Sequence, residues 1–524
     1  MEHNVIEDMV TQEERPQMFG HPKGLFYLFF AELWERFSFY GMRALLMLYM
    51  TSELFAHMGK EDADIKGIGI YAAYGALVYA TPLLGGMIAD RLIGYRKSIM
   101  LGGILMALGH FAMAFPGDIF FFGALGLIIV GNGFFKPNIS SLVGSLYEQG
   151  DLRRDSGFTI FYMGINIGGF LSPLLCGWLG HAYGWHYGFG LAGIGMLAGL
   201  IFFWQGVNSN VFGNEGLQPK EYQGSNVDKL VYIGALALVP IAALLVYFND
   251  LSFFGTELMG AIVGIIFLVA LIITLSIMAK VSNVEKGRIV VILFITLLLT
   301  VFWAFFEQAG SSITLFAERN VNLFMMNASQ TNSINSFFII LLAIPFSAMW
   351  TLLGKSGSNP RTPIKYALGI AQLGLGFLIF AVSAHFMDGS GNVPFIFLIL
   401  GYLFITTGEL FVSPIGLSKV TELAPKEAVA FFMGVFFLSS MGAHYIAGII
   451  AKITSTGGGE QSPFWSNIIE SVTGLSNTEG LSEGVQSLAN YTGVFTQIAV
   501  VSFGCAIITL ILSPIINRLM KGIH

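Results

Sequence analysis

Charge is scarce in this sequence. Only 11% of its 524 residues are Asp, Glu, Lys or Arg, whereas a soluble protein carries roughly 25%. The chain is 55% hydrophobic, and its mean hydropathy is +0.72. So few charges cannot cover the surface of a soluble fold of this length. Most of the chain must therefore face lipid or other apolar helices.

Patterns for metal binding and catalysis are missing as well. Both cysteines, Cys176 and Cys505, fall inside apolar runs without the spacing of metal ligands, so we expect two small buried side chains. The sequence has no HExxH, no nucleophile elbow and no clustered Cys and His residues. A net charge of −6 gives no reason to expect nucleic-acid binding. We therefore expect neither an enzyme nor a metal or organic cofactor.

Apolar runs long enough to span a bilayer, about 20 residues each, recur along the whole chain. The polar residues 1–23 lack the features of a signal peptide, so the first run is expected to stay in the mature protein. The sequence predicts an all-α integral membrane protein with fourteen spans. Their expected limits are 24–52, 67–91, 97–115, 119–147, 156–181, 187–206, 230–248, 256–280, 288–317, 333–354, 362–386, 394–414, 427–453 and 491–517.

The distribution of positive charge predicts the orientation. With an even number of spans both termini lie on one side. Nineteen of the 26 Lys and Arg residues then fall in segments on that side, against four on the other. Cytoplasmic segments carry the excess of Lys and Arg, so both termini are expected in the cytoplasm. The chain is thus predicted to be a multi-pass protein of the cytoplasmic (inner) cell membrane.

Fourteen spans are best divided as six, two and six. Residues 1–206 would form an N-terminal six-helix bundle, and residues 288–524 a C-terminal one. Residues 207–287 would hold a cytoplasmic linker and two accessory helices, because that helix pair has few polar groups away from its outer turn. The Gly-, Ser- and Asn-rich residues 454–490 are expected to be a solvated outer connector.

Charged residues inside the spans point to function. A charge at the bilayer centre costs about 2.5–3.5 kcal/mol on insertion scales, so it needs a partner or water. Seven such residues, four acidic and three basic, lie at depth, which indicates internal pairing. They are Glu32, Glu35, Arg36, Arg43, Lys136, Glu307 and Glu409.

The first span carries a polar stripe. Glu32, Glu35 and Arg36 lie at i, i+3 and i+4, so they share a helical face. Tyr40 and Arg43 continue the stripe, and Arg43 lies within roughly 20° of Glu32 on the helical wheel and about 16 Å along the axis. A salt bridge that only holds helices together rarely involves five polar groups along one helical face. We therefore expect this face to line a polar cavity.

Shorter polar runs recur at helical spacing on other spans. Together with Lys136 they place ionisable or amide groups on helices of both halves, which is typical of a pathway between two bundles. These groups are Tyr162 and Asn166, Trp303, Glu307 and Ser311, Asn332 and Asn335, and Glu409 and Ser413.

Several of these segments resemble one known family. ELWERFSFYG at 32–41 resembles the ExxER motif of the proton-dependent oligopeptide transporter (POT) family, within the major facilitator superfamily. FYMGINIG at 161–168 is similar to the family's second signature, and GGMIADRLIGYRK at 85–97 to the superfamily's loop motif. FWAFFEQ and GELFVSPIGLS also look like family segments. The resemblance covers the chain from about residue 24 to 519.

The resemblance implies a major facilitator fold of two six-helix bundles plus two extra transmembrane helices. It implies import of di- and tripeptides with protons by alternating access. We expect a functional monomer, with an oligomer as the alternative, and no cofactor. Proton coupling would involve Glu32, Glu35, Arg36, Lys136 and Glu307. Substrate would be bound by Tyr40, Arg43, Tyr79, Lys136, Asn166, Trp303, Glu307, Asn335, Glu409 and Ser413. Asp90 and Arg91 would act in gating.

The sequence departs from the family pattern at a few positions. Phe39, Asn332 and Phe436 stand where tyrosine, glutamine and tryptophan are common, which bears on side-chain preference rather than on the fold. His444 stands where many members have asparagine, and we interpret it as a polar packing residue.

Two other functions compete with peptide symport. The substrate could instead be nitrate or another small metabolite, although Glu409 favours a solute with an amine. A channel is disfavoured, because a gradient-driven pore needs no paired opposite charges across two bundles.

Overall fold

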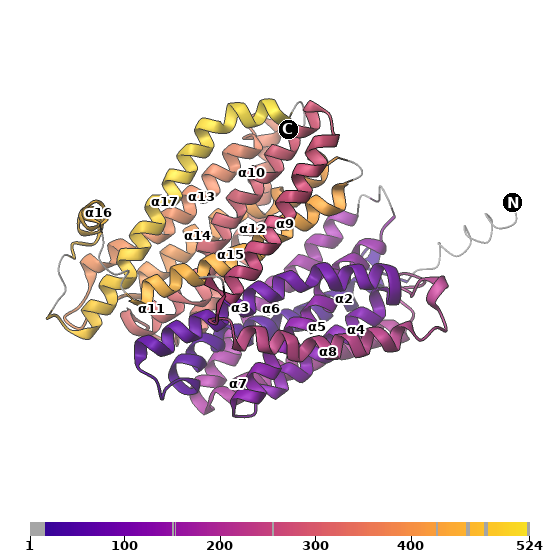
Figure 1. The fold of residues 1–524 in the computed structure, drawn as a ribbon, viewed down its shortest axis with the longest axis horizontal. Helices are drawn as coiled ribbons and strands as arrows, with labels where there is room; N and C mark the ends of the chain where they lie inside the picture. Colours follow the sequence, from indigo (N-terminus) through magenta and orange to yellow (C-terminus); the bar gives the residue numbers. More distant parts are fainter. Residues whose placement is uncertain are drawn as a thin grey trace, which may run out of the picture. The chain divides into compact units, whose positions relative to one another are not determined.

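The computed structural model describes residues 16–148, 151, 153–253, 256–425, 428–456, 462–475 and 480–520. Contacts divide the chain into two compact units. Unit 1 consists of Met1–Met42 and Ala80–Leu244, and unit 2 of Arg43–Tyr79 and Leu245–His524. The division falls inside α2 (Lys23–Tyr49), inside α3 (Lys60–Ile88) and in the last turn of α8 (Val227–Tyr247), so α2 and α3 each contribute to both units and α8 belongs mostly to unit 1. Figure 1 labels these helices. The domain limits expected from the sequence stay a prediction.

Unit 1 consists of long helices joined by short turns. Gly94 (φ 76°) separates a π-helical turn from α4, and Gly184 (φ 116°) separates α6 from α7. These left-handed conformations suit glycine, which has no Cβ. Besides parts of α2 and α3, the unit contains β1 (Gln17–Met18) paired antiparallel with β2 (His21–Pro22), the π-helical turn Ala89–Ile93, α4 (Gly94–Ala112), α5 (Asp118–Ser145), α6 (Arg154–Tyr183), α7 (Trp185–Asn208), the 3-10 turn Lys220–Tyr222 and α8 (Val227–Tyr247).

Unit 2 is also helical. A capping box begins α10, where Ser282 Oγ accepts from the Glu285 backbone N–H at 3.3 Å and the Glu285 carboxylate accepts from the Ser282 N–H at 3.0 Å. Its helices are α9 (Leu258–Lys280), α10 (Asn283–Phe306), α11 (Ser312–Asn320), α12 (Ser333–Lys355), α13 (Thr362–Val382), α14 (Phe395–Leu423), α15 (Val429–Thr456), α16 (Pro463–Thr473) and α17 (Glu483–Met520). The unit also contains the parts of α2 and α3 within residues 43–79, the π-helical turn Met50–Leu54 between them, and three 3-10 turns, Glu307–Gly310, Ser329–Asn332 and Ser383–Phe386. Four short strands form two pairs: β3 (Ser252–Phe253) pairs antiparallel with β4 (Thr256–Glu257), and β5 (Val321–Asn322) pairs parallel with β6 (Val393–Pro394).

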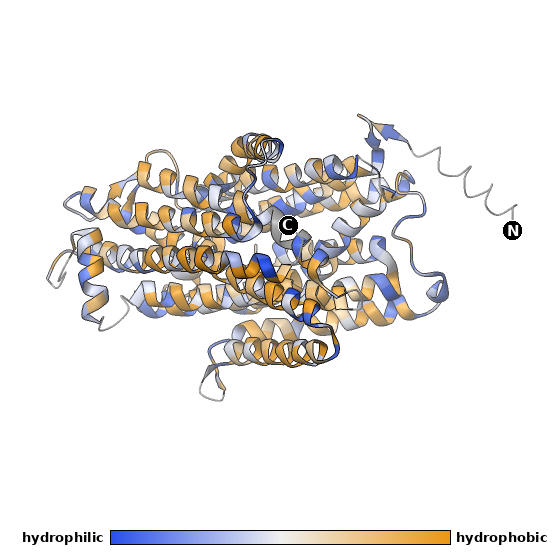
Figure 2. Ribbon diagram, turned by 90° about the horizontal axis from the view of Figure 1, so that it is seen from above, coloured by the Kyte–Doolittle hydropathy of each residue, from blue (hydrophilic) through white to orange (hydrophobic). Residues whose placement is uncertain are grey.

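Twelve segments of the described residues are long and apolar enough to cross a membrane. One of them, Lys60–Ala112, contains both α3 and α4. The helix α2 is not among the twelve, because five charged residues interrupt its apolar sequence. Figure 2 shows hydrophobic residues dominating the helices. The all-α membrane class is confirmed, whereas the count of fourteen spans stays a prediction.

Glycines let helices of unit 1 approach closely. A Cβ at Gly102 of α4 would lie 2.5 Å from the Gly131 carbonyl oxygen of α5, and one at Gly131 would lie 2.7 Å from the Gly102 oxygen. Such contacts between small residues are a common basis of helix association in membranes. Cys176 is buried in this unit as expected, whereas Cys505 of unit 2 is only partly buried.

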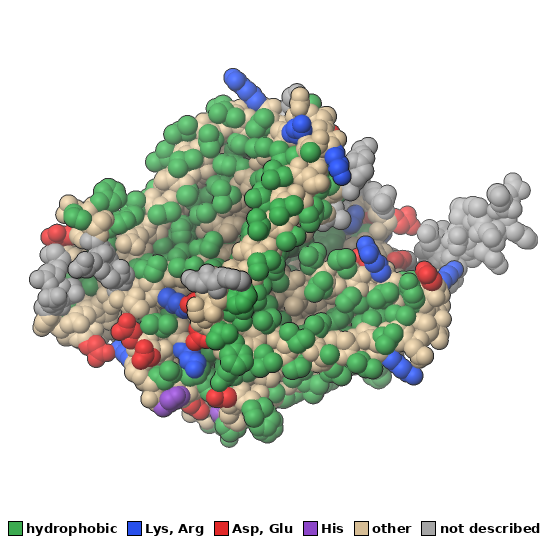
Figure 3. Space-filling view, in the orientation of Figure 1, with side chains coloured by type: hydrophobic (Ala, Val, Ile, Leu, Met, Phe, Trp, Pro, Cys, Tyr) green, Lys and Arg blue, Asp and Glu red, His purple; other side chains and the backbone are tan. Residues whose placement is uncertain are grey.

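The two accessory helices expose most of their apolar surface. In α8 and α9, 17% and 11% of the most apolar segment is buried, against 72% in α5. Figure 3 shows hydrophobic side chains covering both helices, with charged groups near helix ends. This exposure is what lipid-facing helices require.

The expected outer connector at 454–490 is not wholly irregular. The helix α16, Pro463–Thr473, lies within it, begins with Pro at its first position and ends at Gly474 in a left-handed conformation. The sequence did not predict this helix, because it has only 11 residues and lies in a segment rich in Gly and Ser.

Candidate functional site

Three charges on α2 form a buried cluster in unit 1. Arg36 Nε lies 3.1 Å from Glu32 Oε1, and Arg36 Nη2 donates to Glu35 Oε1 at 2.9 Å. All three residues are at most 3% exposed. Arg36 therefore holds together two carboxylates one turn apart, which would otherwise repel each other.

Glycines on α6 and α7 bury this part of α2. A Cβ at Gly168 would lie 2.4 Å from the Leu33 carbonyl oxygen and 3.1 Å from Arg36 Cβ. On α7, a Cβ at Gly199 would lie 3.0 Å from the Ala31 carbonyl oxygen. These close approaches pack α2 directly against α6 and α7 beside the charged cluster.

Lys136 on α5 balances the charge of the buried cluster of Glu32, Glu35 and Arg36. It lies within electrostatic range of Glu32, Glu35 and Arg36. Two carboxylates and two cations sum to zero, so gain of a single proton unbalances the group unless an anion arrives or a cation leaves. A buried group of this kind can couple proton binding to a change of partners.

The aromatic and amide residues expected beside this cluster are found in the same unit. The Arg36 guanidinium carbon lies 5.3 Å from the ring centroid of Phe39 and 6.0 Å from that of Tyr40. Asn166 is buried on α6, and its Nδ2 donates to the Tyr162 carbonyl one turn earlier at 3.0 Å. Phe39, a departure from the family pattern, thus keeps a cation–π contact that needs no hydroxyl.

Arg43 and Glu307 form an ion pair within unit 2, from α2 and the 3-10 turn that follows α10. Arg43 Nε also donates to the Tyr71 hydroxyl of α3 at 2.5 Å. Glu307 is 5% exposed. A cation held by one carboxylate and one phenol keeps its remaining N–H groups available for another anion.

Glu409 lies on α14 with an amide partner. Asn335 Nδ2 donates to Glu409 Oε2 at 3.1 Å and to Thr406 Oγ1 at 3.0 Å. Glu409 is 8% exposed and lies within electrostatic range of Glu307. The carboxylate accepts from neutral donors here, so its charge can still attract a cationic group.

The remaining expected residues are placed as follows. Ser413 is partly buried one turn after Glu409, and Trp303 of α10 packs edge-to-face on Phe306, ring centroids 5.0 Å apart. Asp90 and Arg91 lie exposed in the π-helical turn between α3 and α4.

The basic residues that follow the π-helical turn hold the linker. Arg96 Nε donates to the Glu215 carbonyl at 2.7 Å, and Lys97 Nζ donates to Gln218 Oε1 at 2.7 Å and pairs with Asp228. These contacts fasten the linker to the start of α4.

Sequence reasoning missed two pairings in unit 2. His444 Nε2 lies 3.7 Å from Glu307 Oε1, and Arg319 forms a bidentate ion pair with Asp64. Neither pair has local spacing, since the partners lie 137 and 255 residues apart in the chain. One local pattern did point to the His444 site. Tyr71, Gly75 and Tyr79 lie at intervals of four residues, so they share a face of α3, and Gly75 leaves a notch between the two tyrosines.

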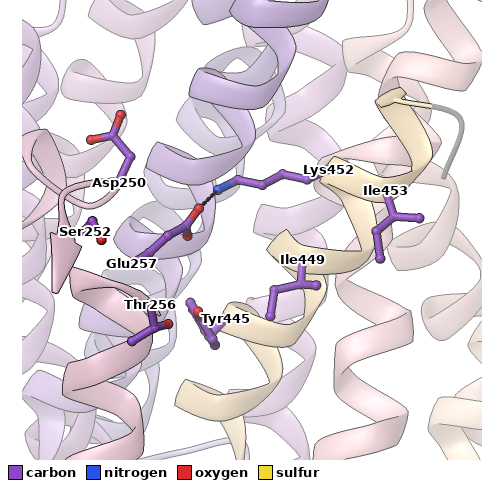
Figure 4. A pocket seen from close by; sticks show the side chains of 8 residues that line it. All are labelled: Asp250, Ser252, Thr256, Glu257, Tyr445, Ile449, Lys452 and Ile453. Atoms are coloured by element: carbon purple, nitrogen blue, oxygen red, sulfur yellow. Dashed lines mark hydrogen bonds and ion pairs between the residues drawn. The ribbon is translucent and has the colours of Figure 1, made fainter. Parts of the chain in front are cut away.

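A cavity of about 490 Å³ lies away from these groups, at the turn between α8 and α9 (Figure 4). Glu257 and Lys452 form an ion pair on its wall, and Asp250 lies on the other side of the turn. The pair joins β4 to α15. The described residues contain no group of three or more His, Cys, Asp or Glu side chains that could hold a metal ion.

Comparisons with known proteins agree on one family. The sequence profile of the POT family matches residues 96–463. The chain is 37% identical to the uncharacterized transporter YclF of Bacillus subtilis (strain 168) over 99% of both chains. It is 37% identical to a di-/tripeptide transporter of Lactococcus lactis subsp. cremoris, over 83% of this chain and 90% of that one. A crystal structure of the peptide transporter POT in complex with sulfate matches with a TM-score of 0.77 and 35% identity, over 97% of this chain and 98% of that one.

Proposed function

The chain belongs to the POT family, and on that premise we propose that it is a proton-coupled symporter that imports di- and tripeptides by alternating access. Membership makes it a multi-pass membrane transporter with the major facilitator fold, and not an enzyme. The proposal adds the substrate, the coupling ion, the cytoplasmic (inner) membrane with both termini in the cytoplasm, and a functional monomer without a cofactor.

The observation that carries the proposal is the ion pair of Arg43 and Glu307 in a unit that also contains Glu409. A short peptide is a zwitterion, so its site needs a cation for the carboxylate and an anion for the amine. Arg43 suits the first role, because guanidinium N–H groups bind carboxylates in a bidentate manner. Glu409 suits the second, because its present partner Asn335 is neutral.

The same pair supports coupling to protons. While Glu307 is ionised it holds Arg43; when a proton from the outer solution neutralises the carboxylate, Arg43 becomes available to a peptide carboxylate. Release of the peptide and of the proton on the inner side restores the pair. In unit 1 the balanced group of Glu32, Glu35, Arg36 and Lys136 would respond to a second protonation and favour inward opening. Tyr40, Tyr79, Asn166, Trp303 and Ser413 would line the substrate path, and Asp90 with Arg91 would act in gating.

Uptake of labelled dialanine by proteoliposomes, with and without an inward proton gradient, tests the proposal. We expect accumulation only with the gradient, and loss of accumulation in Glu307→Gln. Glu470→Gln, which removes an exposed carboxylate of α16, is the matched control and should accumulate dialanine normally. Accumulation by Glu307→Gln would refute the role of the ion pair. Gradient-driven nitrate uptake without dialanine uptake would favour the alternative substrate class.

A further inference from the structure

His444 lies against the carboxylate to which the proposed function assigns the proton. The imidazole is 5% exposed, and its Nε2 is 3.7 Å from Glu307 Oε1. The other carboxylate oxygen, Oε2, pairs with Arg43. Glu307 thus lies between a permanent cation and a side chain that can acquire a charge near neutral pH.

The imidazole ring is held by one face of α3. Tyr79 stacks on it, with ring centroids 4.8 Å apart and ring planes at 26°. A Cβ at Gly75 would lie 2.6 Å from Nδ1, so any larger residue there would fill the space that the ring occupies. Because Tyr71, Gly75 and Tyr79 follow one another at intervals of four residues, they share a face, and His444 occupies the notch in its middle.

Contacts beside the pair hold the elements that carry His444 and Glu307 together. Gln308, the residue after Glu307, is fully buried, and its Nε2 donates to the Ala447 carbonyl of α15 at 3.1 Å. One residue further on, a Cβ at Gly448 would lie 2.4 Å from Ala72 Cβ, so α15 and α3 are in close contact. The turn that carries Glu307 is therefore fastened to the helix that carries His444. Nε2 and Oε1 lie 3.7 Å apart, and an approach of roughly 0.8 Å would bring them to hydrogen-bond distance.

The charges around the pair show what an imidazolium would do. The facing charged and titratable groups are Arg43 of α2, Tyr71 and Tyr79 of α3, Glu307 of the 3-10 turn, and Glu409 and Tyr402 of α14. Within the part of the chain that the structure describes, Arg43 is the cation of this set. When Arg43 binds a substrate carboxylate, Glu307 loses its counter-ion in a buried place, where an unpaired charge is costly.

We propose that His444 shares the coupling proton with Glu307. In the empty state Arg43 balances Glu307 and the imidazole is neutral. One proton from the outer solution then enters as Arg43 turns to the substrate, and it is held between Nε2 and Oε1. The pair carries the same proton and the same net charge whether it is written as imidazolium with carboxylate or as imidazole with carboxylic acid. The proton leaves to the inner side when the peptide departs and Arg43 returns.

The inference rests on the proposed function and states where its proton resides, so the test separates the two. A carboxyl group with an imidazole partner binds a proton more tightly than the carboxyl group alone. In His444→Asn, the pH profile of gradient-driven dialanine uptake should therefore move to lower pH, by about one unit if proton affinity falls tenfold. His444→Gln, whose amide can donate to Glu307 but cannot carry the proton, should show the same shift, which guards against poor folding of one variant.

A control variant and a second measurement test whether the shift is specific to His444. His385→Asn removes an exposed imidazole that contacts the Val472 carbonyl, and its profile should match the wild type. A second readout is the binding of dialanine to purified protein in weakly buffered detergent. The wild type should take up about one proton per peptide, and His444→Asn clearly less. In a Glu307→Gln background, the His444 substitution should not change the proton uptake further.

The outcomes are distinct. If the wild type neither accumulates nor exchanges dialanine, the proposed function fails. If the wild type accumulates dialanine and both His444 variants follow its pH profile and its proton uptake, the inference alone fails, and His444 is a packing residue. A shift in both variants with a wild-type profile in His385→Asn supports the shared proton.

Discussion

Arg319 and Asp64 form a bidentate ion pair that joins α11 to α3 within unit 2. Nη1 donates to Oδ2 at 2.6 Å and Nη2 to Oδ1 at 2.7 Å, while Nη1 also donates to the Tyr491 hydroxyl of α17 at 3.1 Å. The Asp64 side chain is 3% exposed and that of Arg319 is 18% exposed. Three helices that are distant in sequence therefore meet at one guanidinium, which is planar and suited to such contacts.

Loss of this pair should destabilise unit 2. Asp64→Asn leaves Arg319 with no anionic partner in this ion pair, and removing one partner of a buried pair costs several kcal/mol. Because Arg319 is partly exposed, we expect a loss of about 3 kcal/mol in the free energy of unfolding, seen as a lower melting temperature in detergent. Lys60→Gln is the control, since it breaks a pair with Glu483 whose side chains are 54% and 79% exposed, so it should leave the melting temperature almost unchanged. Equal losses in both variants would contradict this account.

The sequence predicted the membrane class and the local part of the site. Scarce charge identified the class, and the spacing of Glu32, Glu35 and Arg36 identified the buried cluster, because contacts at i+3 and i+4 follow from helical geometry alone. The pairing of Arg43 with Glu307 does not follow from helical spacing, because the two residues lie 264 positions apart in the chain.

Long-range partners were beyond sequence reasoning. Asp64 resembles the other acids near the start of α3, and His444 is one polar residue on an apolar helix. Their roles depend on which helices pack together, and helical periodicity does not determine that choice. The notch at Gly75 was visible in the sequence, but its occupant on α15 was not.

Glycine at position 168 should be required for the packing of α2. In Gly168→Ala the new methyl group would meet the Leu33 carbonyl at 2.4 Å and the Phe37 nitrogen at 3.0 Å, and backbone cannot give way as a flexible side chain can. We expect a clearly lower melting temperature and loss of dialanine uptake. Gly234→Ala on α8 is the matched control, because nothing lies within 4 Å of its Cβ and alanine favours a helix by roughly 1 kcal/mol over glycine. A Gly168→Ala variant as stable and active as Gly234→Ala would show that α2 can move aside.

Glu35 should affect coupling more than exchange. Glu35→Gln keeps the shape of the buried cluster but removes a carboxylate that pairs with Arg36. We expect dialanine counterflow, which needs no net proton movement, to continue, and accumulation driven by a proton gradient to fall at least about tenfold, the effect of roughly 1.4 kcal/mol. Equal loss of both activities would indicate that Glu35 serves folding instead, and a melting curve of the purified variant would confirm that outcome.

Glu409 should recognise the peptide amine. The carboxylate is buried and accepts from Asn335, so Glu409→Gln preserves size while removing the charge that an ammonium group would meet. Charge-assisted hydrogen bonds are about twice as strong as neutral ones, so we expect dialanine to bind at least about tenfold more weakly. N-acetyl-dialanine lacks the ammonium group, so its binding should already be weak in the wild type and should change little in the variant. Competition against labelled dialanine measures both affinities at one pH. Asn335→Ala is the informative companion, because it keeps the charge of Glu409 and removes one donor to it; its effect should be smaller than that of Glu409→Gln. If the two peptides lose affinity equally in Glu409→Gln, the carboxylate shapes the site without contacting the amine.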